Sequence, residues 1–357
     1  MVSLGERQLR EGAGMKDIQL IRCPAHLLHD VVKWLCRNST SPDEKTLHRE
    51  VTFLDAAVET SRLRGLVSAD IRLPRWAETR WCTLHRSLEL LLEVCTSLPD
   101  VGLQFQRWDV IMTAVGVTKI TGRSSLAQVE STIKRTDPRI RIRLYLTNYL
   151  LAIFSRHIKW FESTGCVAPL VLEQFTKIEH DLSIPITAPG LNATAEELEW
   201  INLIRASSLV KWRQISSDNF DSATQPLWEL LQLLNPSRKS TRAQEDNVYL
   251  QQLSQFSSRV PNIDRSRVRE ELCTYLAQPF NRQLTGAQVW DYWRDSQNRF
   301  PNLAPLALAL LCIPISSAEA ERSLKDLKEL QMNPKRTNLT REHASWLAFM
   351  YYNRHTS

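Results

Sequence analysis

The chain has 357 residues, enough for two or three domains, and 45 Lys and Arg against 39 Asp and Glu give it a net charge of +6. This mild basic excess is compatible with nucleic acid but does not establish it, because many proteins carry the same balance. Seven cysteines without a C-x-x-C pair favour a reducing compartment over a disulfide framework.

Secretion and membrane insertion are not expected. The opening residues, MVSLGERQLREGAG, lack the apolar core of a signal peptide, and the longest apolar run, Leu303 to Ile315, is shorter than the roughly 20 residues that cross a bilayer. We expect a protein of the nucleus or cytoplasm. Ten glycines without a G-x-x-x-x-G-K-[ST], G-x-G-x-x-G or G-x-S-x-G motif disfavour folds built on glycine loops.

The N-terminal part predicts one short strand followed by a helix. Ile18 to Cys23 is a brief apolar run that ends before Pro24, and helical spacing follows from about Ala25 to Leu35. The polar residues 37–46 close this first segment. The long helical patterns further along indicate a chain that is mostly α-helical.

Cys23 and His26, with His29 one turn later, place a thiol near two imidazoles. A complete zinc site needs four ligands, and the others would have to come from distant residues such as Cys36 or His48. The stronger interpretation is structural, with a buried thiol and a hydrogen-bonded imidazole at the start of a helix. We therefore predict no bound metal here.

Residues 77–83, A-E-T-R-W-C-T, precede a helix predicted at Leu84 to Val94. Trp81 either packs against the helix as a hydrophobic staple or presents its indole to a base. Arg80 either contacts a phosphate or pairs with Glu78. Without further context the staple is favoured, so this segment alone does not predict nucleic-acid binding.

The most basic stretch is Lys134 to Lys159, where seven Lys and Arg accompany a single acid, Asp137. Arg139, Arg141 and Arg143 alternate with aliphatic residues, and aromatic residues follow. Basic residues interleaved with aromatics can track a phosphate backbone. The alternative is a helix with a solvated charged face and its aromatics in the core, and the two interpretations carry equal weight.

Helical periodicity predicts several more helices. They lie at Ile140 to Phe161, Glu196 to Trp212, Val268 to Leu276 and Ala287 to Arg294. Turn-forming and polar composition predicts linkers at Ser183 to Thr194 and Ser216 to Gln225, and a mobile segment at Asn235 to Asp246.

The C-terminal stretch predicts three helices in succession. The apolar run Leu303 to Leu311 forms the first, because Pro314 forces it to stop. Ser316 and Glu319 have capping-box spacing for the second. In that helix Glu321 lies three residues before the inward-facing Leu324, so its carboxylate is poorly placed for simple solvation.

The third predicted helix follows Thr340 and has hardly any polar face. A terminal helix that is apolar all round needs cover on two sides, which one chain end rarely supplies. We therefore expect it to contact a partner. Its apolar residues are Trp346, Leu347, Ala348, Phe349, Met350 and Tyr351.

Five motifs taken together resemble the hAT superfamily of DNA transposases. They are I-R-C-P-A-H from Ile21, T-R-W from Thr79, W-D-Y-W from Trp290, F-P-N-L-A from Phe300 and I-S-S-A-E-A-E-R from Ile315. The resemblance is most specific from Glu270 to Asn353, the family's C-terminal dimerisation region. It implies a remnant of an RNase H-like α/β core at 1–46, a large helical insertion at 47–265 and dimerisation helices at 266–357.

The resemblance also implies roles for individual residues. In active hAT enzymes three acidic residues bind two divalent metal ions, and the last of them corresponds to Glu321. The tryptophan of T-R-W, which stacks on a base, corresponds to Trp81, and the structural C-x-x-H pair corresponds to Cys23 and His26. The residues expected at the dimer interface are Trp290, Trp293, Leu324, Trp346, Leu347, Phe349, Met350 and Tyr351.

The sequence departs from the family pattern before Cys23. The first two catalytic aspartates should lie upstream of it, yet acids there such as Glu6 and Asp17 lack the Asp-Asn-Ala type of context. One carboxylate, a vestigial Glu321, cannot hold two ions. We therefore expect no transposition activity and no cofactor, with Mg²⁺ or Mn²⁺ relevant only if the acidic triad were complete.

Three hypotheses for the function determine which partners are expected. The leading hypothesis is a transposase-derived protein that forms a homodimer or a hetero-oligomer with related proteins. The alternative is a DNA-binding module that uses Arg80, Trp81 and the three arginines of the basic stretch. An active metal-dependent transposase or nuclease ranks third.

Overall fold

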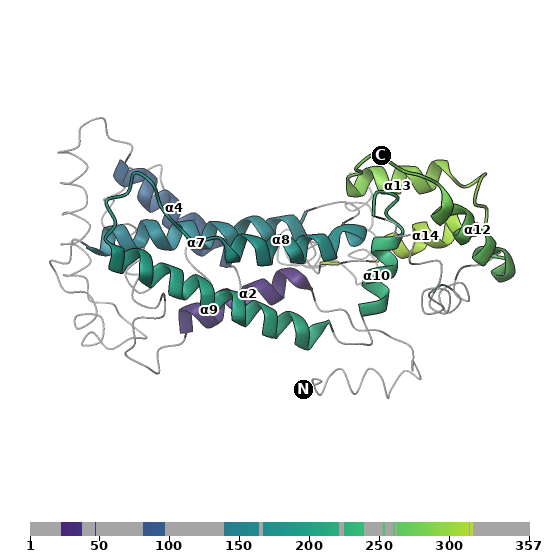
Figure 1. Ribbon diagram of the computed structural model, residues 1–357. Helices are drawn as coiled ribbons and strands as arrows, with labels where there is room; N and C mark the ends of the chain where they lie inside the picture. Colours follow the sequence, from purple (N-terminus) through teal and green to yellow (C-terminus); the bar gives the residue numbers. More distant parts are fainter. Residues whose placement is uncertain are drawn as a thin grey trace, which may run out of the picture. The chain divides into compact units, whose positions relative to one another are not determined.

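The computed structural model shows a chain of helices that divides into two compact units (Figure 1). We call residues 25–160 and 173–219 the middle unit, and residues 1–24, 161–172 and 220–357 the terminal unit. The described residues contain no β-strand, so the expected mostly α fold is confirmed for them. They are residues 23–37, 47, 81–96, 139–163, 167–220, 225–238, 253, 260, 263–313, 315 and 316.

The helices of the middle unit bury apolar stripes at helical spacing. In the first of them Leu28, Val31 and Leu35 recur every three or four residues and are at most 1 % exposed. The helices are α2 (Pro24–Arg37), α4 (Trp81–Thr96), α7 (Arg139–Phe161), α8 (Val171–Ser183) and α9 (Ala195–Asn219).

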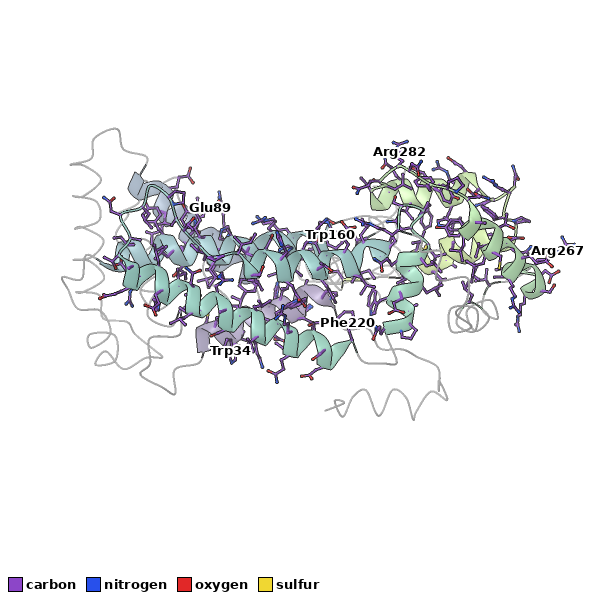
Figure 2. All side chains as sticks on the ribbon, viewed as in Figure 1. Trp34, Glu89, Trp160, Phe220, Arg267 and Arg282 are labelled. Carbon is purple, nitrogen blue, oxygen red and sulfur yellow. The ribbon has the colours of Figure 1, made fainter. Side chains whose placement is uncertain are left out.

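Side chains fill the space between α7, α8 and α9 (Figure 2). Phe175 of α8 meets Trp212 of α9 edge to face, with 5.2 Å between the ring centroids. An ion pair at the surface, Arg213 Nη2 to Glu179 Oε2 at 3.1 Å, joins the same two helices. Helices α8 and α9 are therefore joined by an aromatic contact inside the unit and an ion pair at its surface.

The segment between α8 and α9 is a linker, as predicted, but α9 holds it firmly. Asn202 accepts a hydrogen bond from the Ile186 amide at 2.8 Å and donates to the Ile186 carbonyl at 3.0 Å. The Arg205 guanidinium donates to the carbonyl of Leu182 in the last turn of α8. Such a bond satisfies one of the carbonyls that a helix end leaves without a partner.

The terminal unit packs short helices around an aromatic core. Contacts join α10 to the 3₁₀ turn η1, and join α14 to both α12 and α13. The elements are η1 (Ala168–Leu170), α10 (Gln225–Leu233), α12 (Arg265–Ala277), α13 (Gly286–Asp295) and α14 (Leu303–Leu311).

The helices predicted from periodicity are all present where the chain is described, and α8 and α10 are additional. The predicted linker from Ser216 to Gln225 is wrong at its start, because α9 continues to Asn219. Ser216 Oγ donates to the Arg213 carbonyl at 3.1 Å, and Ser217 Oγ donates to the Gln214 carbonyl at 2.9 Å. The hydroxyls thus satisfy themselves on the preceding turn of the same helix instead of ending it.

The segment predicted to be mobile, Asn235 to Asp246, is ordered over its first four residues. Asn235 is only 1 % exposed and accepts from the Ser237 amide at 3.0 Å, which closes a tight turn after α10. Residues 239–246 lie outside the described part, as do residues 18–22 of the strand candidate.

The boundaries of the two compact units differ from those of the predicted domains. The predicted domain ranges stay a prediction. No helix in the described residues is long and apolar enough to span a membrane.

Candidate functional site

Five aromatic rings form the centre of the terminal unit. Trp293 of α13 is 0 % exposed, and its ring centroid lies 4.8 Å from that of Tyr275 in α12. Phe300 lies 6.2 Å from both rings, and Tyr292 lies 5.4 Å from Trp293. Phe280, in the loop between α12 and α13, meets Tyr292 edge to face at 5.8 Å. These offset and edge-to-face geometries are the favourable ones for aromatic pairs.

Two of the buried rings also donate hydrogen bonds to the end of α10. The Tyr275 hydroxyl donates to the Leu233 carbonyl at 2.9 Å, and Trp293 Nε1 donates to the Leu234 carbonyl at 2.7 Å. The last carbonyls of a helix need such partners. Burial raises the pKa of Tyr275 well above its ordinary range, so the hydroxyl keeps its proton. The bonds fix α12 and α13 against α10.

The loop that joins α12 to α13 is held by one hydroxyl. Ser237 Oγ donates to the Arg282 carbonyl at 2.8 Å and accepts from the Leu284 amide at 2.9 Å. Immediately afterwards, Thr285 and Gln288 form a capping box at the start of α13. The start of the helix that carries W-D-Y-W is therefore fixed on both sides.

The Glu271 carboxylate caps the start of α14 from the neighbouring helix. It accepts from the Asn302 amide at 2.9 Å, the Leu303 amide at 2.7 Å and the Asn302 side-chain amide at 2.6 Å. Asn302 Oδ1 in turn accepts from the Asp264 amide at 2.9 Å, at the start of α12. A carboxylate is favourable there because a helix start presents free amides and a partial positive charge.

All nine residues of α14 are apolar, and the helix does not bury its whole circumference. Ala309 is exposed, and Pro305 and Leu308 are partly exposed. An apolar helix with an open face is a candidate contact surface. The residues that it buries are Leu303, Ala304, Leu306, Ala307, Leu310 and Leu311.

The residues predicted for dimerisation divide into two groups. Trp293 is 0 % exposed and lies in the chain's own core, which leaves no indole surface for a partner. Trp290, on the same helix, is partly exposed. The remaining residues lie outside the described part, as does Glu321. They are Leu324, Trp346, Leu347, Phe349, Met350 and Tyr351.

Four of the five residues predicted for DNA contact lie near the starts of α4 and α7 in the middle unit. Trp81 is the first residue of α4, and Arg139 and Arg141 are in the first turn of α7. The side chains of these three residues, and the whole of Arg80, lie outside the described part of the chain. Arg143 is described, and its guanidinium carbon lies 4.8 Å from the centre of the Trp200 ring. This stacking engages the guanidinium inside the chain.

The cysteine and histidine motif connects to a distant part of the chain. Cys23 Sγ donates to Ser316 Oγ at 3.6 Å, which joins two of the sequence motifs that lie 293 residues apart. His26 is exposed, and its ring lies 5.6 Å from that of His29. Within the described residues no group of three or more His, Cys, Asp or Glu could hold a metal ion.

Sequence reasoning missed the residues that connect distant elements of the site. Glu271, Asn302, Tyr275 and Ser237 bond to groups 31 to 47 positions away. Nothing in local spacing marks such partners. Phe300 belongs to the F-P-N-L-A motif, but the motif does not predict that its ring lies in the aromatic core.

Residues 271–353 match the family profile described as the hAT family C-terminal dimerisation region. The match begins at Glu271 in α12, includes α13 and α14, and continues beyond the described residues. The resemblance to the hAT family is thereby confirmed for this part of the chain. No curated protein matches the chain.

Proposed function

We propose that this chain, which carries an hAT C-terminal dimerisation region, is a transposase-derived protein that works by association of two copies through its terminal unit. The observation that carries the proposal is the match over residues 271–353. The partly open apolar face of α14 in a rigidly held helical platform supports it. The capping of α14 by Glu271 and the bonds of Tyr275 and Trp293 pre-organise this platform, which lowers the cost of binding.

Sedimentation velocity of the full chain tests this association. We expect a dimer at micromolar concentration that is weakened by Trp346→Asp or Phe349→Asp, and also by Leu308→Asp on the partly exposed face of α14. The matched control is Ile184→Asp, which alters an exposed apolar side chain of the middle unit. A monomer at all concentrations, or equal weakening by the control, would refute the proposal.

The chain by itself does not catalyse strand transfer. This proposal rests on the family pattern, which requires three carboxylates around two metal ions, of which Glu321 supplies one. The Cys23 to Ser316 contact supports a retained piece of the RNase H-like core at residues 1–46, because it holds the motif of Cys23 against the motif that contains Glu321. Cleavage of DNA with Mg²⁺ or Mn²⁺ that disappears in Glu321→Gln would overturn the proposed inactivity.

DNA association in the nucleus is a second candidate function, which the basic composition of residues 134–159 favours. Since Arg143 stacks on Trp200, Arg139 and Arg141 are the better candidates for phosphate contact. Binding to duplex DNA should fall steeply with salt and weaken in Arg139→Ala with Arg141→Ala. Arg267→Ala, an exposed arginine of the terminal unit, is the control. No binding at low salt removes this function.

A further inference from the structure

Helix α9 carries a second apolar stripe on the side opposite its buried face. Ile201, Ile204 and Trp212 are 0 % exposed and face the interior of the middle unit. Leu203 and Val210, in contrast, are 46 % and 68 % exposed. A helix with one buried face is expected to be polar on its outer side, so this second stripe needs its own explanation.

The outer stripe has the spacing of a helix-pairing seam. Leu203, the exposed Ala206 and Val210 lie at positions i, i+3 and i+7, which places them in line along the helix. Ala206 in the middle lets a neighbouring backbone approach closely. Of the four large apolar side chains that are exposed in the described residues, two belong to this stripe, so the exposure is concentrated and not scattered.

The charges at the two ends of the stripe are of opposite sign. Glu196 and Glu199 lie in the first turns of α9, and Lys211 and Arg213 lie beyond Val210. Arg213 remains well exposed, with 58 % of its side chain accessible, although it pairs with Glu179. The apolar stripe is thus flanked by acidic residues on its N-terminal side and by basic residues on its C-terminal side, while the last turn of α9 carries Asp218 and no basic residue.

From this pattern we infer that α9 pairs in antiparallel orientation with α9 of a second copy of the chain. The antiparallel orientation sets the acidic residues before the stripe of each helix beside the basic residues after the stripe of the other, whereas a parallel pair would set like charges together. Antiparallel helices also oppose their macrodipoles favourably. The stripe is therefore complementary to itself, which favours a second copy over an unrelated helix.

This surface lies on the middle unit and does not depend on the proposed association of the terminal unit. Three small or medium side chains bury little area, so α9 pairing alone is weak. When terminal units already join two chains, each assembly carries two copies of the stripe, and pairing gains from multivalency. The two surfaces together would build assemblies larger than a dimer.

Sedimentation velocity of the full chain over a concentration series tests the inference. We expect species beyond the dimer at tens of micromolar that dissociate on dilution. Leu203→Glu with Val210→Glu should weaken this step by about tenfold or more, because it places charges inside an apolar contact. Ile184→Glu is the control for adding charge at an exposed apolar site, and circular dichroism checks that each variant remains helical.

A charge exchange tests the orientation. Glu199→Lys and Lys211→Glu should each weaken the larger species several-fold, and the two together should restore it, because the ends again carry opposite charges. The inference is overturned if no association of the wild-type protein is weakened by the Leu203 and Val210 changes, or if the protein stops at a dimer that only Trp346→Asp weakens. Failure of both single exchanges to weaken the step, or of the double exchange to restore it, overturns the antiparallel orientation.

The outcome is separable from that of the proposed function. If the terminal unit does not associate, the chain still forms a weak dimer that is sensitive to Leu203→Glu with Val210→Glu and insensitive to Trp346→Asp. If only the terminal unit associates, the dimer forms and no larger species follows.

Discussion

The most deeply buried side chains that join helices by hydrogen bonds differ in chemistry between the two units. In the terminal unit, neutral aromatic donors, Tyr275 and Trp293, reach backbone carbonyls at the end of α10. In the middle unit, the corresponding interior contact is a chain of ionisable and amide side chains between α7 and α8. His157, which is 2 % exposed, lies at its centre.

The geometry around His157 defines its proton. Gln174 Nε2 lies 2.7 Å from Nδ1 and donates to it, so Nε2 carries the hydrogen and donates to Asp181 Oδ2 at 3.1 Å. Burial lowers the pKa of His157, and the raising effect of Asp181 only partly offsets this. Arg156, 3.3 Å from the same carboxylate oxygen, and Lys177 lower the pKa further.

This difference between the two interiors predicts which unit responds to a change in pH. The described residues of the terminal unit include no histidine, and burial raises the pKa of Tyr275 further above neutral. This described interior should therefore change little from mildly acidic to mildly basic pH. The middle unit, which carries the outer stripe of α9, should be the pH-sensitive part.

Removal of the Trp293 ring should cause the largest loss of stability, and this loss should be confined to the terminal unit. Trp293→Ala opens a cavity in the aromatic core and frees the Leu234 carbonyl, so we expect a loss of about 3–5 kcal/mol. Hydrogen exchange should show increased opening in α12, α13 and α14 and little change in α9. Equal exchange in both units would contradict the division into two units. Trp293→Phe, which keeps most of the packing, should cost clearly less.

Removal of the Glu271 carboxylate should have the second largest effect. Glu271→Ala leaves two amides at the start of α14 without their acceptor, and we expect a loss of about 2–3 kcal/mol. Glu270→Ala, at the exposed neighbouring position of α12, is the matched control and should cost less than about 0.5 kcal/mol. Chemical denaturation with hydrogen exchange measures both, and similar losses would refute the capping role.

Acidification should destabilise the middle unit alone. The pKa of His157 is lowered from its ordinary value of 6.5, so the unfolded chain takes up a proton that the folded unit resists. The middle unit therefore has its full free energy of unfolding above pH 6.5. This free energy falls as the pH drops from 6.5 towards the folded pKa of His157, by at most about 1.4 kcal/mol per pH unit for one proton.

His85 of α4, whose pKa is also lowered chiefly by burial, adds in the same direction. Denaturant midpoints followed by hydrogen exchange between pH 7.5 and 5.5 measure the slope, where these pH limits are about one unit either side of the ordinary pKa. His157→Gln should reduce the slope in the middle unit and leave the part due to His85. A stronger pH dependence in the terminal unit would contradict the contrast between the two interiors.

The sequence predicted individual elements well and their contacts poorly. The helices predicted at Ile140 to Phe161 and Leu303 to Leu311 are confirmed, because periodicity is a local signal. The side of a helix on which a tryptophan lies depends on elements far along the chain, so the burial of Trp293 could not be read from its motif. The stacking of Arg143 on Trp200 joins helices more than fifty residues apart for the same reason.

The smallest expected loss of stability concerns a capping box, which occurs once in each unit. Thr194 and Glu197 form a capping box at the start of α9, as Thr285 and Gln288 do at α13. Thr194→Ala and Thr285→Ala should each cost about 1 kcal/mol, because each removes the acceptor of one helix-start amide. Hydrogen exchange should localise each loss to its own unit, and serine at either position should retain most of the stability.

The partners of the two threonines then separate the units. Glu197 is 2 % exposed and one of its carboxylate oxygens lacks a hydrogen-bond partner, whereas Gln288 is neutral and partly exposed. Glu197→Gln removes a buried charge and should cost little or even stabilise α9, since the amide oxygen can still accept from the Thr194 amide. Gln288→Glu should change stability by less than about 0.5 kcal/mol at its more exposed site. A large loss in Glu197→Gln would show that the charge itself holds the start of α9.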